Sequence, residues 1–253
     1  MKIYGGKTYE QMSEKAASVI AAQVIENPRS VLGLATGSTP IGLYGFLAKW
    51  YEEKYLSFKE CKTVNLDEYC GIGPDHDQSY AYFMRENLFS KIDILPENTN
   101  IPNGLNPDAA AECARYDKVI EDLGYADVQL LGLGNNGHIG FNEPAPAFVP
   151  GVNHVKLTDS TINANARFFA SREEVPKSAY TMGIKGIMNA KKVLLVANGT
   201  GKAEILEKAL FGPVTPEVPA SVLQLHRDVV VCADEAALSV IAKKHPDAIE
   251  WFR

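Results

Sequence analysis

The sequence predicts an α/β protein built on a doubly wound, mostly parallel sheet that is flanked by helices. Three observations favour this class. Five short stretches are expected as strands, and most of them are largely apolar rather than alternating, which is typical of strands buried on both faces of a sheet. Longer stretches with helical periodicity separate them, as crossovers between parallel strands require. The 253 residues, 46% of them hydrophobic and 22% charged, have a globular composition, and we expect residues 1–253 to form a single domain.

The expected elements alternate along the chain. Thr8 and Gln11 have the spacing of a capping box and Pro28 closes the segment, so a first helix is expected over about residues 8–27. Buried strands are expected at Ser30–Ala35, Lys62–Leu66, Asp127–Leu133, Lys191–Ala197 and Asp228–Cys232. Further helices are expected at Ile41–Lys54, Ser79–Phe89, Pro107–Leu123, Lys202–Leu210 and Glu235–Lys243. Because ligands bind beyond the carboxyl ends of the strands in such a sheet, chemistry is expected directly after Ala35, Leu66, Leu133 and Ala197.

The overall charge argues against several classes of partner. A formal net charge of −6 gives no support to binding of nucleic acid or of an anionic membrane, so neither is an expected partner. No apolar run reaches about 18 residues, so no membrane span is expected. The first six residues lack the apolar core of a signal peptide. The expected location is therefore the cytoplasm.

Cysteine and histidine spacing predicts no metal centre. The cysteines form no CxxC pair, and scattered thiols in a chain of this size suggest a reducing compartment; they are Cys61, Cys70, Cys113 and Cys232. No HExxH motif is present, and four of the five histidines form no metal-spaced cluster; they are His76, His154, His226 and His245.

Two of the predicted strands lead into segments that suit an anion. Residues 36–39 (Thr-Gly-Ser-Thr) precede a helix start, where backbone N–H groups and hydroxyls can hold a phosphate; an ordinary cap and tight turn is the alternative. The segment lacks the Lys of a GxxxxGK[ST] loop, so it is not a nucleotide-binding P-loop. Lys202 follows two glycines at another helix start, where it is either an anion ligand or a solvated side chain.

Arg167 lies between apolar residues, away from these two segments. It is either a surface residue whose aliphatic part packs on the protein or a second phosphate ligand.

The strand at residues 62–66 ends in two adjacent carboxylates, Asp67 and Glu68. Such a carboxylate at a strand end can supply a general base. The alternative is that Asp67 caps the next turn while Glu68 faces solvent. The local pattern leaves both interpretations open.

The richest segment, residues 132–144, follows the third predicted strand. Its glycines formally satisfy GxGxxG, but a dinucleotide site needs a helix at once, and Gly140, Asn142 and Pro144 oppose one. A loop that brings its backbone close to a small ligand fits better. It presents His138 near Glu143, an imidazole and a carboxylate that can form an acid–base pair, although a single His can also be purely structural.

Taken together, these segments resemble the glucosamine-6-phosphate deaminase (glucosamine-6-phosphate isomerase) family. The residues that carry the resemblance are 35–40 (ATGSTP), 65–69 (NLDEY), 134–144 (GNNGHIGFNEP), 165–169 (NARFF) and 221–226 (SVLQLH). The resemblance spans nearly the whole chain in the expected order and implies a Rossmann-like fold of the sugar-phosphate isomerase/deaminase type. The 6-phosphogluconolactonases are similar up to the Gly-x-x-Gly-His core but usually lack the Phe-Asn-Glu-Pro continuation.

The resemblance implies that glucosamine 6-phosphate is converted to fructose 6-phosphate and ammonia, in the catabolism of amino sugars such as N-acetylglucosamine. It implies no cofactor, because the carbonyl of the substrate acts as electron sink. By resemblance, Asp67 is the base that moves a proton between C2 and C1, and His138 opens the ring with help from Glu143 and Asn136. The family often has Asp at position 136, where Asn can orient His138 but cannot carry charge. The implied substrate- and phosphate-binding residues are Thr36, Gly37, Ser38, Thr39, Glu68, Gly137, Arg167 and Lys202.

Regulation and three other functions remain open at this point. Some bacterial relatives are hexamers activated by N-acetylglucosamine 6-phosphate, and they tend to have a basic cluster after the Phe-Asn-Glu-Pro segment and a longer C-terminus. Residues 151–156 carry little charge here, so a non-allosteric or weakly regulated enzyme is expected, as a monomer or homo-oligomer. The alternatives are a 6-phosphogluconolactonase, which needs no C2 base, and a sugar-phosphate sensor without catalysis. A dinucleotide-dependent oxidoreductase is a third.

Overall fold

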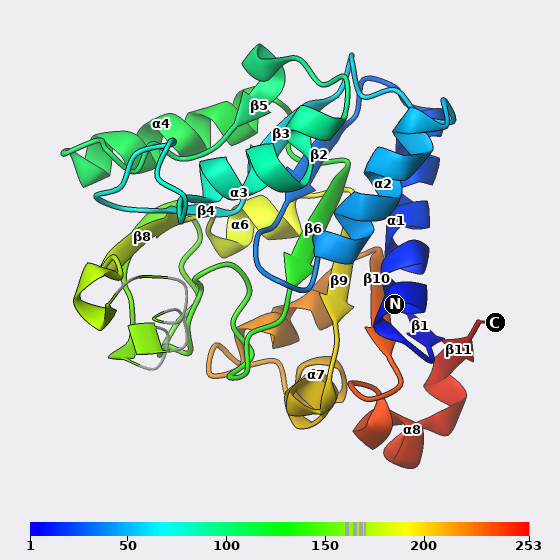
Figure 1. Ribbon diagram of the computed structural model, residues 1–253. Coiled ribbons are helices and arrows are strands. Elements are labelled where there is room, and N and C mark those ends of the chain that lie inside the picture. Colours follow the sequence, from blue (N-terminus) through cyan, green and yellow to red (C-terminus); the bar gives the residue numbers. More distant parts are fainter. Residues whose placement is uncertain (160–161, 164–165, 167–168, 170, 253) are drawn as a thin grey trace.

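An eight-stranded parallel sheet runs through the centre of this computed structural model, which describes residues 1–159, 162–163, 166, 169 and 171–252 (Figure 1). In order across the sheet its strands are β11 (Ile249–Trp251), β1 (Lys2–Gly6), β10 (Val229–Asp234), β9 (Lys192–Ala197), β6 (Val128–Gly132), β2 (Val31–Leu34), β3 (Lys62–Asn65) and β5 (Thr99–Asn100). Every neighbouring pair is parallel. A parallel sheet must be covered on both faces, and helices cover it here.

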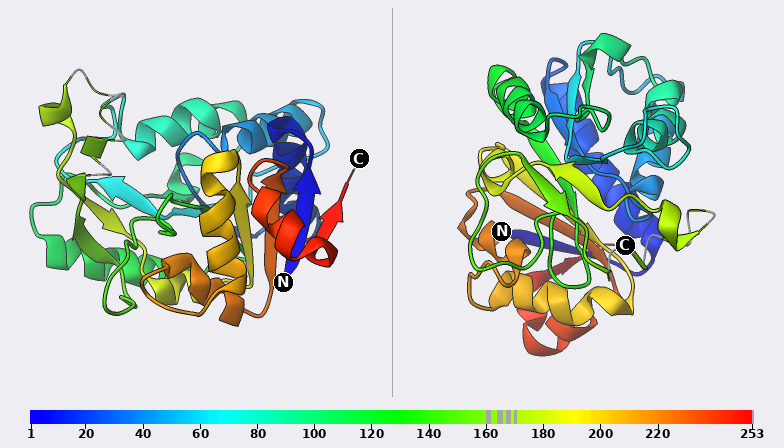
Figure 2. Two further views of the ribbon diagram at one scale, coloured as in Figure 1. Left: turned by 90° about the horizontal axis from the view of Figure 1, so that it is seen from below. Right: turned by 90° about the vertical axis from the view of Figure 1, so that its left-hand side faces the viewer.

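The helices divide between the two faces according to the direction in which the chain crosses the sheet. In the described chain they are α1 (Tyr9–Glu26), α2 (Ile41–Glu52), α3 (Tyr80–Asn87), α4 (Ala109–Asp122), α6 (Ile184–Met188), α7 (Ala203–Phe211) and α8 (Ser239–Lys244). The crossovers through α1 and α2 run toward β3, and those through α7 and α8 run toward β11. Because parallel crossovers are right-handed, opposite directions put the helices on opposite faces, as Figure 2 shows.

A second, three-stranded sheet lies beyond the carboxyl end of β3. It has the order β4-β8-β7, with β4 at Asp67–Tyr69, β8 at Ser178–Thr181 and β7 at Asn153–Lys156, and both pairings are antiparallel. Only Leu66 separates β3 from β4, and its carbonyl accepts the backbone N–H of Met182 at 2.6 Å. The chain therefore changes from one sheet to the other at Asp67.

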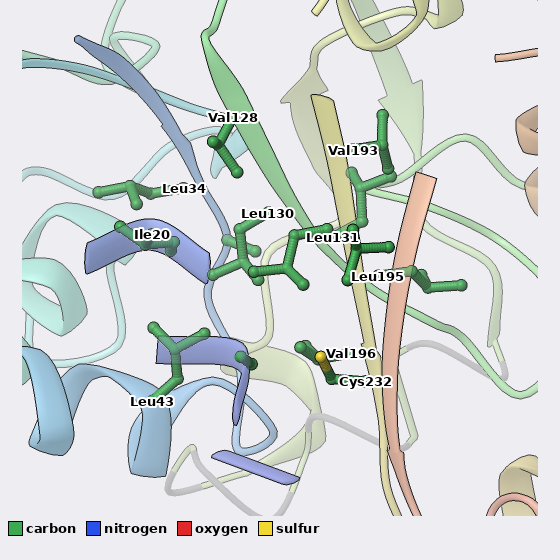
Figure 3. Close-up of a cluster of buried hydrophobic side chains, with 14 of the residues drawn as sticks. Ile20, Leu34, Leu43, Val128, Leu130, Leu131, Val193, Leu195, Val196 and Cys232 are labelled. Carbon is green, nitrogen blue, oxygen red and sulfur yellow. The ribbon is translucent and has the colours of Figure 1, made fainter. Parts of the chain in front are cut away.

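The core lies between the large sheet and its helices. Figure 3 shows Ile20 of α1 and Leu43 of α2 gathered with Leu34 of β2 and Leu130 of β6, all of them buried. Truncating such a residue to Ala typically costs about 2–5 kcal/mol. The packed core therefore stabilises the central strands, which position the loops at their ends.

All five predicted strands and all six predicted helices are present, with ends that differ by a few residues. The Thr8 cap is confirmed, since its hydroxyl accepts the N–H of Gln11 at 3.2 Å. The last helix starts later than expected, because α8 begins at Ser239 and residues 235–238 form a turn. The sequence did not predict β1, β4, β5, β7, β8 and β11.

Candidate active site

The four strand ends expected to carry chemistry are neighbours in the large sheet. β9, β6, β2 and β3 follow one another in strand order, so the loops after Ala197, Leu133, Ala35 and Leu66 open at one edge. Crossovers run outward in opposite directions from this point, since β2 continues to β3 and β9 continues to β10. Such a switch point is where a doubly wound sheet opens a crevice for a ligand. The expected meeting of these segments is confirmed.

The loop between β2 and α2 presents free donors to this crevice. Gly37 has φ +100°, a left-handed conformation that favours glycine. From α1, the hydroxyl of Tyr9 donates to the carbonyls of Ser38 at 3.2 Å and Thr39 at 3.0 Å, and so fixes the loop from outside. Within the described chain, the side chains of Thr36 and Ser38 form no hydrogen bond, and Ser38 is exposed. The loop is therefore both positioned and available to bind an anion.

Two hydrogen bonds connect the loops around the crevice. Oγ1 of Thr39 donates to Oδ1 of Asn198, which follows β9, at 2.7 Å. Nζ of Lys202 donates to Oδ1 of Asn135, which follows β6, at 2.5 Å. Burial lowers the pKa of Lys202, which ends the short 3-10 helix η5 (Thr200–Lys202) just before α7. A cation beside the backbone N–H groups of a helix start favours an anionic ligand.

Asp67 is a buried carboxyl group whose carboxylate lacks hydrogen bonds from the described residues. Its exposed fraction is 7%. Burial, followed by the charge of Glu68, raises the pKa of Asp67 to about 8. A carboxylate with a raised pKa is a stronger base once ionised, which suits proton transfer near neutral pH.

Glu68 has a different environment from Asp67. Its Oε1 accepts the N–H groups of Tyr69 at 2.8 Å and Tyr80 at 2.9 Å, and its Oε2 accepts that of Ala81 at 2.9 Å. Glu68 thus caps the start of α3, where a negative charge is favoured. Burial raises the pKa of Glu68 to about 7, although these three bonds act to lower it. The alternative with Asp67 as cap and Glu68 in solvent is wrong, while a contact between Glu68 and substrate stays a prediction.

His138 and Glu143 form an imidazole–carboxylate pair. Nδ1 of His138 lies 3.1 Å from Oε1 of Glu143, and the two side chains are 26% and 16% exposed. The contact lacks hydrogen-bond geometry, and it becomes an ion pair when the imidazole takes up a proton. Asn136 donates from Nδ2 to Oε2 of Glu143 at 2.5 Å and accepts the backbone N–H of His138 at 3.2 Å. Asn136 therefore orients Glu143 and the main chain at His138, rather than the imidazole itself.

Glycines in the same loop bring this pair close to Asp67. A Cβ at Gly134 would lie 2.3 Å from the imidazole of His138, so only glycine fits beneath the ring. A Cβ at Gly140, which has φ +58°, would lie 3.6 Å from Oδ2 of Asp67 and 2.9 Å from Oγ1 of Thr181. The His138 loop thus passes directly beside the buried carboxyl group.

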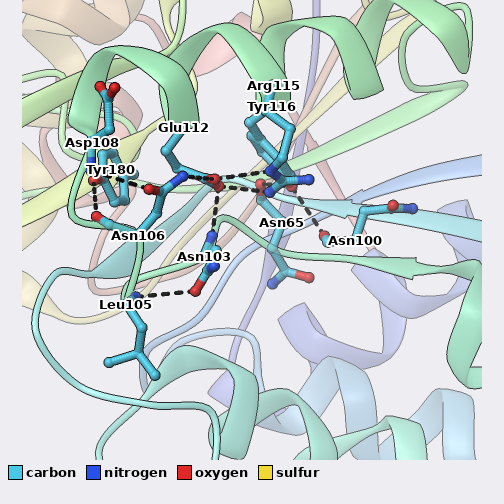
Figure 4. A network of polar contacts seen from close by, with 10 residues as sticks. All are labelled: Asn65, Asn100, Asn103, Leu105, Asn106, Asp108, Glu112, Arg115, Tyr116 and Tyr180. Carbon is cyan, nitrogen blue, oxygen red and sulfur yellow. Dashed lines mark hydrogen bonds and ion pairs between the residues drawn. The ribbon is translucent and has the colours of Figure 1, made fainter.

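A polar network around Glu112 of α4 holds the loop at residues 103–106 (Figure 4). The fully buried carboxylate accepts the N–H of Asn103 at 2.7 Å, the amide of Asn106 at 3.3 Å and the guanidinium of Arg115 at 2.6 and 2.8 Å. Burial acts to raise the pKa of Glu112, but these bonds outweigh it and lower the pKa. The loop is therefore tied firmly to α4.

This loop in turn supports the strand that carries Asp67. A Cβ at Gly104 would lie 2.1 Å from the carbonyl oxygen of Tyr69 in β4, so the two backbones are in close contact. Tyr116 of α4 donates its hydroxyl to the carbonyl of Asn65, at the end of β3, at 2.7 Å (Figure 4). Residues 65–69, which include Asp67, are thus fixed at one end by Tyr116 of α4 and at the other by the loop that α4 holds.

The remaining predictions concern Arg167, Gly137 and metal ions. Arg167 lies outside the described residues, so its contact with a phosphate stays a prediction. Gly137 has φ +87°, and its carbonyl accepts the N–H of Ala220 at 2.8 Å, which braces the His138 loop. In the part of the chain that the structure describes, no three His, Cys, Asp or Glu side chains gather as a metal site would need.

None of the described helices is long and apolar enough to span a membrane.

Three residues that shape the site were not singled out from the sequence. Asn135 and Asn198 accept hydrogen bonds from Lys202 and Thr39, two of the predicted anion ligands. Their place in glycine-rich loops already marked for function is the signal that could have found them. Thr181 accepts the N–H of Phe141 at 3.0 Å. It lies on β8, and nothing in the local sequence relates it to residues 40 positions earlier.

The architecture and the site together define a class of protein. An anion-binding crevice with a buried carboxyl group and an imidazole–carboxylate pair, at the switch point of a doubly wound sheet, is typical of an acid–base enzyme for a small anionic substrate. The chain belongs to the family of glucosamine-6-phosphate isomerases and 6-phosphogluconolactonases, whose sequence model matches residues 6–232.

Relatives with near full-length coverage carry one activity in their names. A glucosamine-6-phosphate deaminase of Lachnoclostridium phytofermentans is 58% identical over 236 residues, which cover 93% of this chain and 100% of the relative. One of Clostridioides difficile is 51% identical and covers 96% and 98%. The solved structure of a monomeric glucosamine-6-phosphate deaminase has a TM-score of 0.92 at 46% identity, covering 95% and 100%. The 6-phosphogluconolactonase of Thermotoga maritima, at 21% identity, TM-score 0.72 and coverage of 92% and 99%, shares the fold alone.

Proposed function

We propose that this chain converts glucosamine 6-phosphate and water to fructose 6-phosphate and ammonia. The observation that carries the proposal is the close approach of the buried Asp67 to the loop with the His138–Glu143 pair, since this reaction needs a base at C2 and a separate acid/base for the ring. Relatives named for this deamination match nearly the whole chain at about half identity or more. The lactonase alternative is not favoured, because the solved lactonase structure shares only the fold.

In the first step, His138 opens the pyranose ring. It takes a proton from the C1 hydroxyl and gives one to the ring oxygen, which produces the C1 aldehyde. Glu143 stabilises the transient imidazolium, and Asn136 holds the Glu143 carboxylate in place. Acid–base catalysis of this kind contributes about 10²–10⁴-fold.

In the second step, Asp67 moves a proton from C2 to C1. The C1 aldehyde acidifies the C2 proton, so a carboxylate with a raised pKa can remove it and form an enolamine. Return of the proton to C1 leaves an imine at C2. Water adds to this imine, and ammonia leaves as the ketose forms. The substrate carbonyl accepts the electrons, so the proposed reaction uses no cofactor.

The phosphate group anchors the substrate at the opposite end of the crevice. In the proposal it is bound by the loop at residues 36–39, by Lys202 and by Arg167. The free donors of the loop and the partly buried ammonium support this assignment. Binding energy from this remote group contributes to positioning C1 and C2 between Asp67 and His138.

The test is a coupled ammonia assay with glucosamine 6-phosphate, run beside its N-acetylated form. Wild type should release ammonia from the free amine only. Asp67→Asn should keep substrate binding within a few-fold but lower kcat by about 10³-fold or more. Asp75→Asn, which changes an exposed carboxylate outside the site, is the matched control and should keep wild-type kinetics. Full activity of the Asp67→Asn variant would refute the base assignment.

The proposal extends to setting and assembly. We propose that the chain acts in the cytoplasm, in the catabolism of amino sugars, with a small sugar phosphate as its ligand. A monomer is supported by the monomeric relative at 46% identity. Light scattering at assay concentration tests the monomer. The ammonia assay with and without N-acetylglucosamine 6-phosphate tests whether the enzyme is non-allosteric or only weakly regulated.

A further inference from the structure

The hydrogen bond between Thr39 and Asn198 joins loops that do not adjoin each other in the sheet. Thr39 follows β2 and Asn198 follows β9, and β6 lies between these strands. Neighbouring strands are about 4.8 Å apart, so the two strand ends lie about 10 Å apart. A side-chain bond of 2.7 Å across this distance brings the two loops together above the end of β6.

Each loop is held independently on its outer side. The hydroxyl of Tyr9 binds the carbonyls at residues 38 and 39 and also accepts the N–H of Gly42 at 2.8 Å. On the other side, both carboxylate oxygens of Asp234 accept the N–H of Gly199 at 3.0 Å. With the outer sides fixed, the bond between Thr39 and Asn198 determines how far apart the inner sides stand.

The bond also separates the roles of two hydroxyls in the first loop. A threonine hydroxyl has one proton, and that of Thr39 is used on Asn198. Ser38 is exposed and keeps its hydroxyl free in the described chain. Ser38 is thus the hydroxyl available to an incoming phosphate, while Thr39 is available to that phosphate only through its backbone.

We infer that Asn198 is a positioning residue, which accepts the Thr39 hydroxyl and thereby sets the width of the phosphate pocket before the substrate binds. This inference rests on the proposed function only in taking the crevice as a phosphate site. A pocket of preset width lowers the cost of ordering the loops on binding. Loss of the bond therefore weakens the binding of phosphate-bearing ligands and leaves the later chemistry intact.

The experiment compares Asn198→Ala, Thr39→Val and the double variant. Each should raise KM for glucosamine 6-phosphate about 3- to 10-fold, as loss of one neutral hydrogen bond predicts, with kcat within about two-fold. The double variant should be no worse than either single one, because both remove the same bond. Thr39→Ser, which keeps a hydroxyl, should raise KM less than Thr39→Val.

Calorimetric titration with inorganic phosphate keeps this inference separate from the proposed function. Its Kd should rise by the same factor as KM in the variants, and it can be measured even if wild type releases no ammonia. The matched control is Thr99→Val, which removes a 2.7 Å threonine bond to the carbonyl of Pro96 far from the crevice and should change neither constant. An unchanged Kd in Asn198→Ala, additive effects in the double variant, or a fall in kcat at constant KM would each overturn the inference.

Discussion

The adjacent carboxyl groups of Asp67 and Glu68 show how neighbouring residues come to differ in chemistry. Glu68 has three backbone N–H partners and Asp67 has none among the described residues. Glu68 nevertheless acts on Asp67, because its charge adds to the effect of burial in raising the pKa of Asp67 to about 8. A capping residue thus adjusts the basicity of the proposed catalytic base.

The first prediction concerns the pH profile. Since Asp67 must be ionised to act as base, kcat/KM should rise with pH through about 8, the raised pKa of Asp67. Glu68→Gln removes the neighbouring charge, which lowers the pKa of Asp67 and should shift the acid limb to lower pH. Initial rates from pH 5.5 to 9.5 measure the shift. Glu97→Gln, at an exposed position outside the site, is the control, and an acid limb that stays in place in Glu68→Gln contradicts the coupling.

At the residue scale, local sequence identifies those residues whose own surroundings carry the signal. Asp67 follows β3 after one residue, and His138 lies in the glycine-rich loop that follows β6, so the sheet topology alone brings both to one edge. The capping role of Glu68 could not be predicted in the same way, because its partners at residues 80 and 81 are selected by the packing of α3. The same holds for Asn198, whose partner lies 159 residues away.

At the scale of elements, β4 is the strand on which the proposed chemistry depends. It has three residues, all buried, and two of them are acidic. Such a segment has low strand propensity, so its conformation comes from its neighbours. β8 pairs with it on one edge, and the loop at residues 103–106 packs against its backbone.

The second prediction tests this support at Glu112. Glu112→Gln replaces one accepting oxygen by a donor, so a buried N–H or guanidinium loses its partner, at a cost of about 1–3 kcal/mol. The free energy of unfolding in urea measures this cost. Glu60→Gln is the matched control, because it removes an exposed partner of Arg29 and should cost less than about 1 kcal/mol. Equal losses in the two variants would contradict a stabilising role of the buried Glu112 network.

The strands that were predicted differ from those that were missed in how clearly the local sequence shows that they are buried. β6 and β9 are mostly apolar and do not alternate with exposed polar residues, as strands covered on both faces require, and both were predicted. β4 is polar and β7 has partly exposed residues, so neither pattern identifies a strand without its partner β8. The small sheet therefore exists through pairing between distant segments, which local sequence does not encode.

At the scale of the whole molecule, the two sheets meet at the junction between β3 and β4. One residue separates β3 from β4, and the carbonyl of that residue, Leu66, binds the N–H that follows β8. Asp67 lies buried at this junction between the two sheets, and its burial there is the main cause of its raised pKa. The ionisation of this residue should for that reason report on the unfolding of the entire chain.

The third prediction is that residues 1–253 unfold in a single cooperative transition whose midpoint depends on Asp67 and on pH. The folded-state pKa of Asp67 is raised, so the stability that it contributes is fully present below its unfolded pKa, about 3.9, and is lost as pH rises through about 8. Asp67→Asn has no charge to bury and should gain stability over wild type between pH 5 and pH 9. Each kcal/mol gained should raise Tm by about 2–4 °C in a chain of this size.

Differential scanning calorimetry at several pH values measures both parts of this prediction, and Asp75→Asn again serves as the control, with a difference from wild type that should not grow with pH. If the three-stranded sheet were a separate domain, the Asp67→Asn variant would shift one of two transitions and leave the other in place. A single transition that moves as a whole, and moves further at high pH, requires that both sheets lose their structure together, because only then does unfolding expose the Asp67 carboxyl group completely.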